Sequence, residues 1–383
     1  MNDLDTSTLP GLITAIHATP HMMVMNFAGA GAEALMLLHS VGGSSRTILE
    51  ATDRYTPASL IEATGFKPER FTSVRVAKAL AQHAFERAQA LVSESKPVFG
   101  LGLTATIATD RKKRGDHRCA IAVTDTFGTV SYDLTMKKGA RTRHEEEHLV
   151  SRLCLYAICE ACGVFDVPDL PLVEGESVKE RFEPVPLLHE LHKGSIDWLC
   201  IKPNGDVSAE PLAHAAFLSG SFNPLHVGHK TLAHVASEQL EQTVYFELPL
   251  INADKDPIDL TEARRRAVQF LGLAPLVLSR APLFSDKANL FPDSVFVLGA
   301  DTAARLVAPR FYEGAKGLEA AFRHLEAQGT RFLVAGRSSK GDFKTLDDIA
   351  IPSHFSTMFT AIPEDAFKMD ISSTQLRNYY ANN

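Results

Sequence analysis

The chain has 383 residues, of which 45% are hydrophobic and 22% are charged, and its formal net charge at pH 7 is -7. No apolar run is long enough to span a bilayer, and the N-terminal sequence lacks the basic and then apolar order of a secretory signal. These features predict a cytoplasmic protein without a membrane partner, and the negative charge argues against nucleic acid as a general partner.

The cysteines are few and odd in number. Three of the five, Cys154, Cys159 and Cys162, lie in one apolar stretch with helical spacing. No second pair stands at the spacing of a zinc or redox site. We therefore expect buried free thiols in a reducing compartment and no metal held by cysteine.

In the N-terminal part, segments with helical apolar spacing alternate with short apolar runs typical of strands. This alternation predicts an α/β domain. The expected helices span residues 9–16, 30–38, 73–92 and 145–162, and the expected strands span residues 22–26, 98–103, 120–123 and 128–134.

Several short motifs in this part resemble the CinA C-terminal family, which is known for amidases that remove the amide nitrogen of nicotinamide mononucleotide. The motifs are the stretch 41–46 with Tyr55 beyond it, the strand end 100–104, and Arg141-x-Arg143. The resemblance covers roughly residues 8–163 and implies a CinA-like α/β domain over residues 1–163. It also implies a mononucleotide site formed by Gly29, Gly31, Ser45, Tyr55, Thr104, Arg111 and Arg114.

One segment departs from that family. Its amidases carry Glu-Ser-x-Thr-Gly-Gly after the first strand, whereas this chain has Phe27-Ala28-Gly29-Ala30-Gly31-Ala32. Alanine has no hydroxyl that could attack an amide or relay a proton. We therefore expect this domain to bind a pyridine mononucleotide rather than cleave it. A displaced hydroxyl from Ser44, Ser45, Tyr55, Thr104 or Thr106 is the alternative that would retain amidase activity.

A loop dense in cations follows one of these strands, from Arg111 to Arg118. Clustered arginine and lysine side chains suit phosphate recognition. An exposed, solvated turn is equally consistent with this charge run, and the sequence leaves both interpretations open.

Residues 164–212 are expected to connect two domains. The part from residue 163 to 186 is rich in Pro, Asp and Glu and has no sustained period, which is typical of a linker. The apolar run 196–201 followed by Asn204-Gly205 then predicts a hairpin with a tight turn.

The second domain, expected over residues 213–383, opens with a short strand at 215–218 and a helix over 230–240. The loop between them reads Gly-Ser-Phe-Asn-Pro-Leu-His-Val-Gly-His, from Gly220 to His229. Glycine lets a ligand approach the backbone, and a helix N-terminus offers unpaired N–H groups to a phosphate. His226 and His229, three residues apart, can reach the same phosphate chain and stabilise charge that develops in the transition state.

This loop resembles the signature of the nucleotidylyltransferase superfamily. A second motif near the end of the chain, Ile371-Ser-Ser-Thr-Gln-Leu-Arg377, makes the domain most similar to the nicotinamide or nicotinate mononucleotide adenylyltransferases. Its hydroxyls would cap a helix and bind phosphate oxygens, and Arg377 would add a fork of donors. The resemblance implies catalytic roles for His226, His229 and Arg377. It implies ATP or phosphate contacts from Gly220, Ser221, Phe222, Asn223, Lys230, Ser372, Ser373 and Thr374.

Three more strands are predicted between the two motifs, at residues 244–248, 294–298 and 331–334, with helices between them. This order predicts a Rossmann-like, doubly wound parallel sheet that binds its ligand at the carboxyl ends of the strands. By the resemblance, Gly299, Asp301 and Arg337 contribute to the nucleotide site, and Asn252 and Lys255 to the acceptor site. The charge run from Arg264 to Arg266 is interpreted as mainly the solvated face of a helix.

The resemblance implies adenylyl transfer from ATP to nicotinamide or nicotinate mononucleotide, which yields a dinucleotide and pyrophosphate. The sequence shows no dedicated cluster of metal ligands, so Mg²⁺ is expected to arrive with ATP. Class I aminoacyl-tRNA synthetases share the His-x-Gly-His loop, but their lysine-rich second motif is absent here. Two alternatives remain: another phosphate acceptor, or a nucleotide-binding regulatory protein without turnover. By family analogy alone, the chain is a candidate homo-oligomer.

Overall fold

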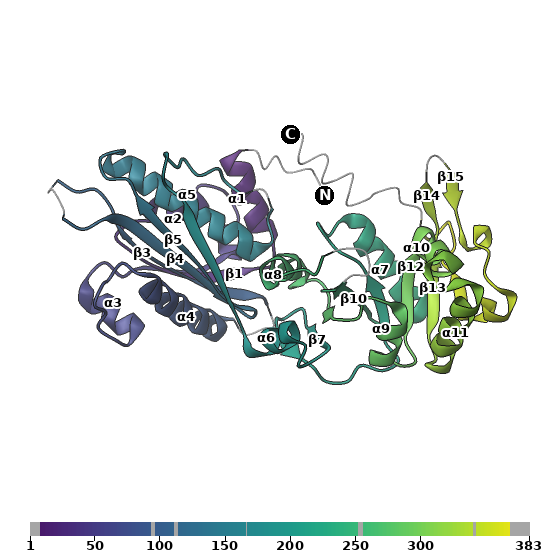
Figure 1. The fold of residues 1–383 in the computed structure, drawn as a ribbon. Coiled ribbons are helices and arrows are strands. Elements are labelled where there is room, and N and C mark those ends of the chain that lie inside the picture. The colour runs from purple at the N-terminus through teal and green to yellow at the C-terminus, as the bar shows by residue number, and fades with distance from the viewer. Residues whose placement is uncertain are drawn as a thin grey trace. The chain divides into compact units, whose positions relative to one another are not determined.

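The computed structural model describes residues 8–92, 96–110, 114–165, 167–251, 256–339 and 342–367. Contacts divide the chain into two compact units (Figure 1). The N-terminal unit comprises Met1–Leu188, Pro203–Asp206 and Ala267–Leu273, and the C-terminal unit comprises His189–Lys202, Val207–Arg266 and Ala274–Asn383. Among the described residues, no helix combines the length and apolarity needed to cross a membrane.

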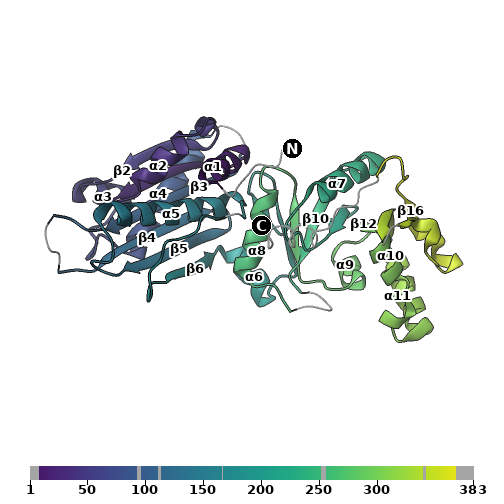
Figure 2. The ribbon, with the colours of Figure 1, turned by 90° about the horizontal axis from the view of Figure 1, so that it is seen from above.

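The N-terminal unit is built on a six-stranded sheet with the order β2-β1-β3-β4-β5-β6. β1 pairs in parallel with β2 and β3, and the strands from β3 to β6 are antiparallel to their neighbours. Helices α1, α2 and α5 cover one face and α3 and α4 the other (Figure 2). The strands are β1 (Met22–Ala28), β2 (Ile48–Asp53), β3 (Val98–Thr106), β4 (His117–Asp125), β5 (Gly128–Met136) and β6 (Val178–Pro184). The helices are α1 (Leu9–Ala18), α2 (Ala32–His39), α3 (Pro57–Thr64), α4 (Val74–Leu91) and α5 (Arg143–Cys162), with a short η1 (Ser44–Arg46).

Local sequence explains how these helices begin and why α4 lies so close to the sheet. Ser73 caps α4 through its hydroxyl, and Thr142 and Glu145 form a capping box at the start of α5. A Cβ atom on Gly100 would lie 2.1 Å from the backbone nitrogen of Phe85. Glycine at this position of β3 therefore allows the backbone of α4 to lie directly on the strand.

The C-terminal unit contains an eight-stranded sheet with the order β16-β13-β12-β9-β10-β11-β7-β8. The strands from β16 to β11 are mutually parallel, and β7 adds in antiparallel orientation. The strands are β7 (Trp198–Ile201), β8 (Val207–Ser208), β9 (Ala216–Ser219), β10 (Val244–Pro249), β11 (Leu276–Ser279), β12 (Val295–Gly299), β13 (Arg331–Ala335) and β16 (Phe359–Ala361). A separate pair joins β14 (Arg337–Ser339) to β15 (Asp342–Lys344).

Read from β11 through β10 and β9 to β12, β13 and β16, the parallel strands have the spatial order 3-2-1-4-5-6. This is the order of the Rossmann fold, and the predicted doubly wound parallel sheet is confirmed. The strand order reverses between β9 and β12, and in such sheets the ligand crevice lies at the carboxyl ends of the strands beside this reversal. A loop follows β9 from Gly220, and β12 ends at Gly299, directly before the helix Ala300–Leu306.

The helices around this sheet are α6 (Pro186–Lys193), α7 (Val227–Leu240), α8 (Leu260–Ala267), α9 (Phe284–Leu290), α10 (Ala300–Leu306) and α11 (Gly314–Ala327). Short 3-10 segments of this unit are η3 (Pro309–Phe311), η4 (Leu346–Asp348) and η5 (Ser353–Met358), whereas η2 (Val268–Phe270) belongs to the N-terminal unit. The core is rich in phenylalanine: Phe217 lies between Phe291 and Phe296, at centroid distances of 4.5 and 5.7 Å. This aromatic core anchors β9, which carries the loop predicted to bind phosphate.

The structure contains elements that the sequence pattern did not predict. Strand β6 lies in the segment expected to be a linker, and that expectation is wrong for Val178–Pro184 because this segment pairs with β5. It is an edge strand with several exposed polar side chains, so apolar periodicity gives little sign of it. The hairpin predicted at Asn204-Gly205 is present as β7 and β8.

Candidate functional site

The loop after β9 folds tightly over Phe222. The backbone N–H of Gly220 donates to the carbonyl oxygen of Glu247 at 3.0 Å. A Cβ atom on Gly220 would lie 2.7 Å from the ring of Phe222, which is fully buried and packs against Phe246. Phe222 has a φ of 44°, and the Asn223–Pro224 peptide is cis. Glycine at position 220 therefore provides the room in which the aromatic ring anchors the loop.

The two predicted histidines meet at the start of α7. His226 is the N-cap residue, and its backbone N–H donates to Nδ1 of His229 at 3.3 Å. The rings stack with centroids 3.6 Å apart, and the edge of Phe222 lies against His229 at 5.1 Å. Because Nδ1 of His229 accepts a hydrogen bond, the neutral ring carries its proton on Nε2. His229 is thus prepared to donate a hydrogen bond from Nε2.

The first turn of α7 adds backbone donors to the histidine pair. Among the described residues, the N–H groups of Val227 and Gly228 have no protein acceptor. Such groups and the helix dipole favour an anion at this end of a helix. The loop follows β9 at the point where the strand order reverses, so donors and imidazoles gather where a doubly wound sheet binds its ligand.

Helix α8 holds the loop from a second direction. Nη1 of Arg266 donates to the carbonyl oxygen of Ser221 at 3.1 Å, and its Nε donates to Glu262 at 2.7 Å. Nδ2 of Asn223 donates to the same carboxylate at 3.4 Å. Neither Arg266 nor Glu262 was predicted to belong to the site. Their i,i+4 spacing was a sequence signal for the pair, although not for its contact with the loop.

The charge run from Arg264 to Arg266 is expected to be mainly a solvated helix face, and this is wrong for Arg264 and Arg266, whereas the side chain of Arg265 is 40% exposed. Arg264 is 4% exposed, and the side chain of Arg266 is 14% exposed. Arg266 turns inward because the Ser221 carbonyl and the Glu262 carboxylate offer it acceptors. A run of charged residues does not reveal such partners, since one of them lies 45 positions away in the chain.

Of the remaining residues predicted to bind a ligand, some lie in the described part of the structure and others lie outside it. Gly299 is the N-cap of α10 and Asp301 lies in its first turn, at the end of β12, while Lys230 is exposed on α7. Arg337 begins β14, but its side chain lies outside the described part of the structure. Outside the described residues altogether are Asn252, Lys255, Ser372, Ser373, Thr374, Arg377 and, in the N-terminal unit, Arg111. The roles of these residues remain predictions.

In the N-terminal unit, a carboxylate binds the backbone of the segment from Gly31 to Glu33, which begins within the stretch that stands in place of the amidase motif. Oε1 of Glu147, on α5, accepts hydrogen bonds from the backbone N–H groups of Gly31 at 2.8 Å and Glu33 at 3.2 Å. Gly31 is the N-cap of α2 and has a φ of 100°. The start of α2, where an anion would bind, therefore holds a side chain of the protein itself.

The other residues predicted to bind a ligand in this unit are dispersed. Gly29 and Thr104 lie together, because β1 and β3 pair Ala28 with Thr104 and a Cβ on Gly29 would overlap the carbonyl of Ala105. Thr104 is buried, whereas Ser45 and Arg114 are exposed and Tyr55 is 69% exposed. The described contacts join neither Tyr55 nor Arg114 to the glycine segment.

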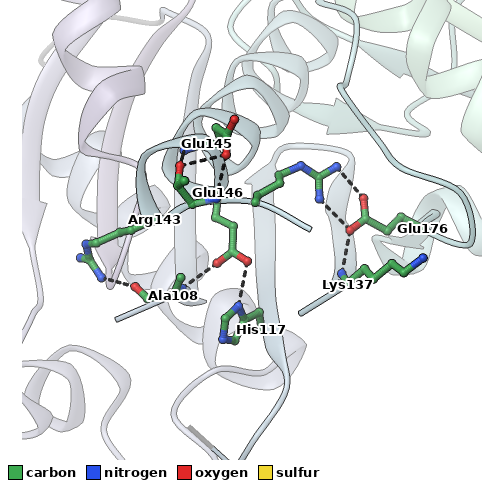
Figure 3. Close-up of polar contacts among 9 residues, drawn as sticks. Ala108, His117, Lys137, Arg143, Glu145, Glu146 and Glu176 are labelled. Carbon is green, nitrogen blue, oxygen red and sulfur yellow. Dashed lines mark hydrogen bonds and ion pairs between the residues drawn. The ribbon is translucent and has the colours of Figure 1, made fainter. Parts of the chain in front are cut away.

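The polar groups around the start of α5 also bind one another (Figure 3). Arg141 forms a two-pronged contact with Glu176, at 2.7 and 2.8 Å, and this arginine lowers the pKa of Glu176 to about 2. Glu146 is fully buried and accepts from the backbone N–H of Ala108 at 2.6 Å, with His117 Nδ1 at 2.7 Å from its other oxygen. These contacts fix the two ends of the cationic β3–β4 loop to α5.

An open hollow of about 400 Å³ lies beside this network, lined by Arg141, His144, Glu145, His148 and Pro171. Its principal cation, Arg141, is engaged by Glu176, and Nδ1 of His148 lies 2.8 Å from Glu33. The charges around the hollow are thus largely compensated within the protein.

All five cysteines are buried and free, which confirms the expected thiols. Burial raises the pKa of Cys119 and Cys162 to about 12, so neither is a thiolate nucleophile at neutral pH. Among the described residues, no group of three or more His, Cys, Asp or Glu side chains is placed to hold a metal ion.

Comparisons with known proteins found matches to different parts of the chain. Residues 217–379 match the family model described as cytidylyltransferase-like. The N-terminal portion is similar to the competence/damage inducible protein CihA from Agrobacterium tumefaciens, at 19% identity over 38% of this chain and 91% of that chain, with a TM-score of 0.32. A CinA superfamily protein from Escherichia coli is similar at 14% identity over 41% of this chain and 92% of that chain, with a TM-score of 0.31.

The structural likenesses are distant and assign no activity to the N-terminal unit. No curated protein matches the chain. The match of the family model includes the histidine loop and extends over the parallel strands β10, β11, β12, β13 and β16. Residues 217–379 therefore form a cytidylyltransferase-like domain of the nucleotidylyltransferase superfamily.

Proposed function

We propose that the C-terminal unit transfers an adenylyl group from ATP to nicotinamide or nicotinate mononucleotide, with a dinucleotide and pyrophosphate as products. The observation that carries the proposal is the stacked pair His226 and His229 at the N-terminus of α7, beside the reversal in strand order. Nucleotidyl transfer is the chemistry of the superfamily to which residues 217–379 belong. The choice of acceptor is the finer part of the proposal and rests on the resemblance of both sequence motifs.

In this reaction, an oxygen of the acceptor's 5′-phosphate forms a bond to the α-phosphorus of ATP. The bond from that phosphorus to the oxygen leading to the β-phosphate breaks, and pyrophosphate leaves. The protein supplies no nucleophile, so its contribution is alignment of two anions and stabilisation of charge. Nε2–H of His229 and the N–H groups of Val227 and Gly228 would donate to phosphate oxygens.

Magnesium would accompany ATP in this scheme. The described residues do not form a cluster of carboxylate or histidine ligands that would hold Mg²⁺ by itself. The ion would therefore be coordinated mainly by ATP phosphates and water, which is how Mg²⁺ is commonly bound in such enzymes. We assign it no residue and no step.

A second acceptor class is supported by the breadth of the matched family. The cytidylyltransferase-like model identifies nucleotidyl transfer but no particular acceptor. In the proposed reaction, the histidine loop binds the phosphates of the nucleotide donor, whereas the choice of acceptor depends on loops at the ends of other strands. A nucleotidylyltransferase that uses another phosphate acceptor is therefore the alternative to test.

For the N-terminal unit, we propose binding of a pyridine mononucleotide without cleavage. Ala28 and Ala30 stand where family amidases have hydroxyl groups, and Glu147 closes the start of α2. A bound mononucleotide would thus place its phosphate away from the N–H groups of Gly31 and Glu33. The cationic β3–β4 loop is the alternative phosphate site within this unit.

The test is pyrophosphate release by the purified chain with ATP and Mg²⁺, measured with nicotinamide mononucleotide, nicotinate mononucleotide or no acceptor. Chromatography separates dinucleotide from deamidated product. Dinucleotide that depends on the acceptor, without deamidation, is the expected result. If ATP binds but neither mononucleotide reacts, the pyridine acceptor is wrong and other phosphate acceptors should be screened. Deamidated product would contradict the proposed loss of amidase activity.

A further inference from the structure

A buried polar cluster lies at the carboxyl ends of β9, β10 and β11, next to the histidine loop but outside it. Its members are Ser219, Glu247, Ser279 and Lys287, one from each of the three strands and one from α9. The side chains of Lys287 and Glu247 are 5% and 0% exposed. Charged side chains are uncommon at this depth of a protein interior unless each is paired with an opposite charge and hydrogen-bonded.

Hydrogen bonds within the cluster occupy its charged atoms. Nζ of Lys287 donates to Oε2 of Glu247 at 2.6 Å and to Oγ of Ser219 at 3.1 Å, and it lies 5.2 Å from the centre of the Phe284 ring. The other carboxylate oxygen of Glu247 accepts from the hydroxyl of Ser279. These contacts leave the ammonium little freedom to reach a ligand, so Lys287 is not a candidate for direct phosphate contact.

The position of Ser219 gives the cluster its significance. Ser219 is the last residue of β9, and Gly220, directly after it, donates its N–H to the backbone carbonyl of Glu247. Glu247 therefore holds the start of the loop twice, through its own carbonyl and through Lys287 to Ser219. The point at which the chain leaves β9 toward His226 and His229 is fixed by these two connections.

A buried ion pair is a poor source of stability. The cost of removing both charges from water usually offsets their attraction, and an apolar pair of similar volume is often as stable. A buried pair can instead select one arrangement of the elements that it joins, and here it joins α9 to the ends of two strands.

We propose that Lys287 is a positioning residue for nucleotidyl transfer, acting through Glu247 and Ser219 on the start of the histidine loop. This inference rests on the proposed function of the same site. It predicts that loss of the ammonium displaces the histidine pair relative to the phosphates. Displacements of about 1 Å at a catalytic group can reduce turnover by about 100-fold.

The test compares Lys287→Met with the double variant Glu247→Gln/Lys287→Met, which removes both charges and so avoids an unpaired buried carboxylate. We expect kcat to fall by about 30-fold or more in both variants, with the KM for ATP changed by less than about threefold. The thermal unfolding temperature should fall in the single variant and recover in the double variant, because the unpaired charge is gone.

Two controls separate positioning from loss of stability. Lys78→Met removes a lysine of the same kind that pairs with Glu183 in the N-terminal unit. Phe322→Leu leaves a cavity in the core of the C-terminal unit, where Phe322 packs against Phe332, Phe355 and Phe359. Both should keep kcat within about twofold of the unaltered protein. Unchanged kcat in Lys287→Met, recovery of kcat in the double variant, or an equal loss in Phe322→Leu would overturn the inference.

Hydrogen exchange of the segment 216–230 tests the same inference without any substrate. Exchange should be faster by about tenfold or more in both Lys287 variants and unchanged in Phe322→Leu. If the unaltered protein makes no dinucleotide, the proposed function fails, while the exchange result still decides whether Lys287 orders the loop. Equal exchange in all proteins would then refute the positioning role.

Discussion

The starts of α2 and α7 differ both in backbone geometry and in use, since the N-cap residue has a φ of 100° at α2 and of -131° at α7. At α2, the carboxylate of Glu147 accepts from the N–H groups of Gly31 and Glu33. At α7, the side chain that reaches back is His229, whose Nδ1 accepts from the His226 backbone, so the neutral ring carries its proton on Nε2. A carboxylate at a helix start neutralises the dipole, whereas an imidazole leaves the site attractive to an anion.

The contrast extends to the surrounding groups. In the N-terminal unit, arginines and carboxylates near the start of α5 bind one another, as in the pair Arg141 and Glu176. In the C-terminal unit, Arg266 and Glu262 bind the loop that carries the histidines. Similar residue types therefore stabilise the fold in one unit and hold a candidate catalytic loop in the other. Four substitutions test this comparison.

His229→Ala should have the largest effect. It removes the Nε2–H donor and the acceptor for the His226 backbone, and loss of one preorganised donor typically reduces kcat by about 100- to 1,000-fold. Binding of ATP should weaken far less, because the donor acts mainly on charge that develops in the transition state. The matched control is His234→Ala, which alters an exposed histidine on the same helix. Equal losses in turnover and ATP binding would contradict the catalytic role.

Glu176→Gln should destabilise the N-terminal unit by about 3 kcal/mol at neutral pH, because it breaks a buried ion pair. The folded-state pKa is about 2 and the ordinary value is 4.5. The stabilisation by the carboxylate is thus present above about pH 4.5 and is lost as the pH falls toward 2. Urea unfolding of both proteins should show a difference that is constant near neutrality and narrows in acid. A difference that widens in acid would contradict the assignment, and nucleotidyl transfer at neutral pH should not change.

Arg266→Ala should reduce kcat by about tenfold, because the loop loses its tie to the Ser221 carbonyl while keeping both histidines. Arg323→Ala is a close control: Arg323 also pairs with a glutamate one turn earlier, at the same distance of 2.7 Å, but it is exposed and does not contact the loop. Steady-state kinetics of the two variants isolate the contact with the loop. If both variants lose activity equally, α8 does not hold the loop in the way described.

The sequence predicted much of the local structure in both units. The helices expected at 9–16, 30–38, 73–92 and 145–162 and the strands expected at 22–26, 98–103, 120–123 and 128–134 are present with small shifts at their ends. In the C-terminal unit, the loop that starts at Gly220 joins a strand to a helix as predicted, although the helix begins at Val227 rather than at residue 230. Apolar periodicity, glycine and capping residues act within a few positions, so they can be recognised in a single sequence.

Contacts between distant residues could not be predicted in this way. Glu147 meets Gly31 across 116 positions, and Lys287 meets Ser219 across 68. Both depend on which strands and helices become neighbours, information that periodicity does not contain. Short strands such as β2, β11 and β16 were missed for a related reason, because pairing with neighbouring strands defines them more than their own composition.

Glu147→Gln should have the smallest effect and is the direct test of the contrast between α2 and α7. The amide oxygen can still accept from Gly31, so we expect a loss of only about 1 kcal/mol from the weaker interaction with the helix start. Burial and then the charge of Glu147 raise the pKa of Asp53, so removal of the charge should lower that pKa partway toward its ordinary value. Thermal unfolding and NMR titration of Asp53 measure the two effects, with Glu62→Gln on the exposed face of α3 as control.

If inorganic phosphate stabilised the Glu147→Gln protein more than the unaltered one, the carboxylate would be occupying an anion site. Equal stabilisation would mean that the carboxylate of Glu147 is not what keeps an anion from the start of α2.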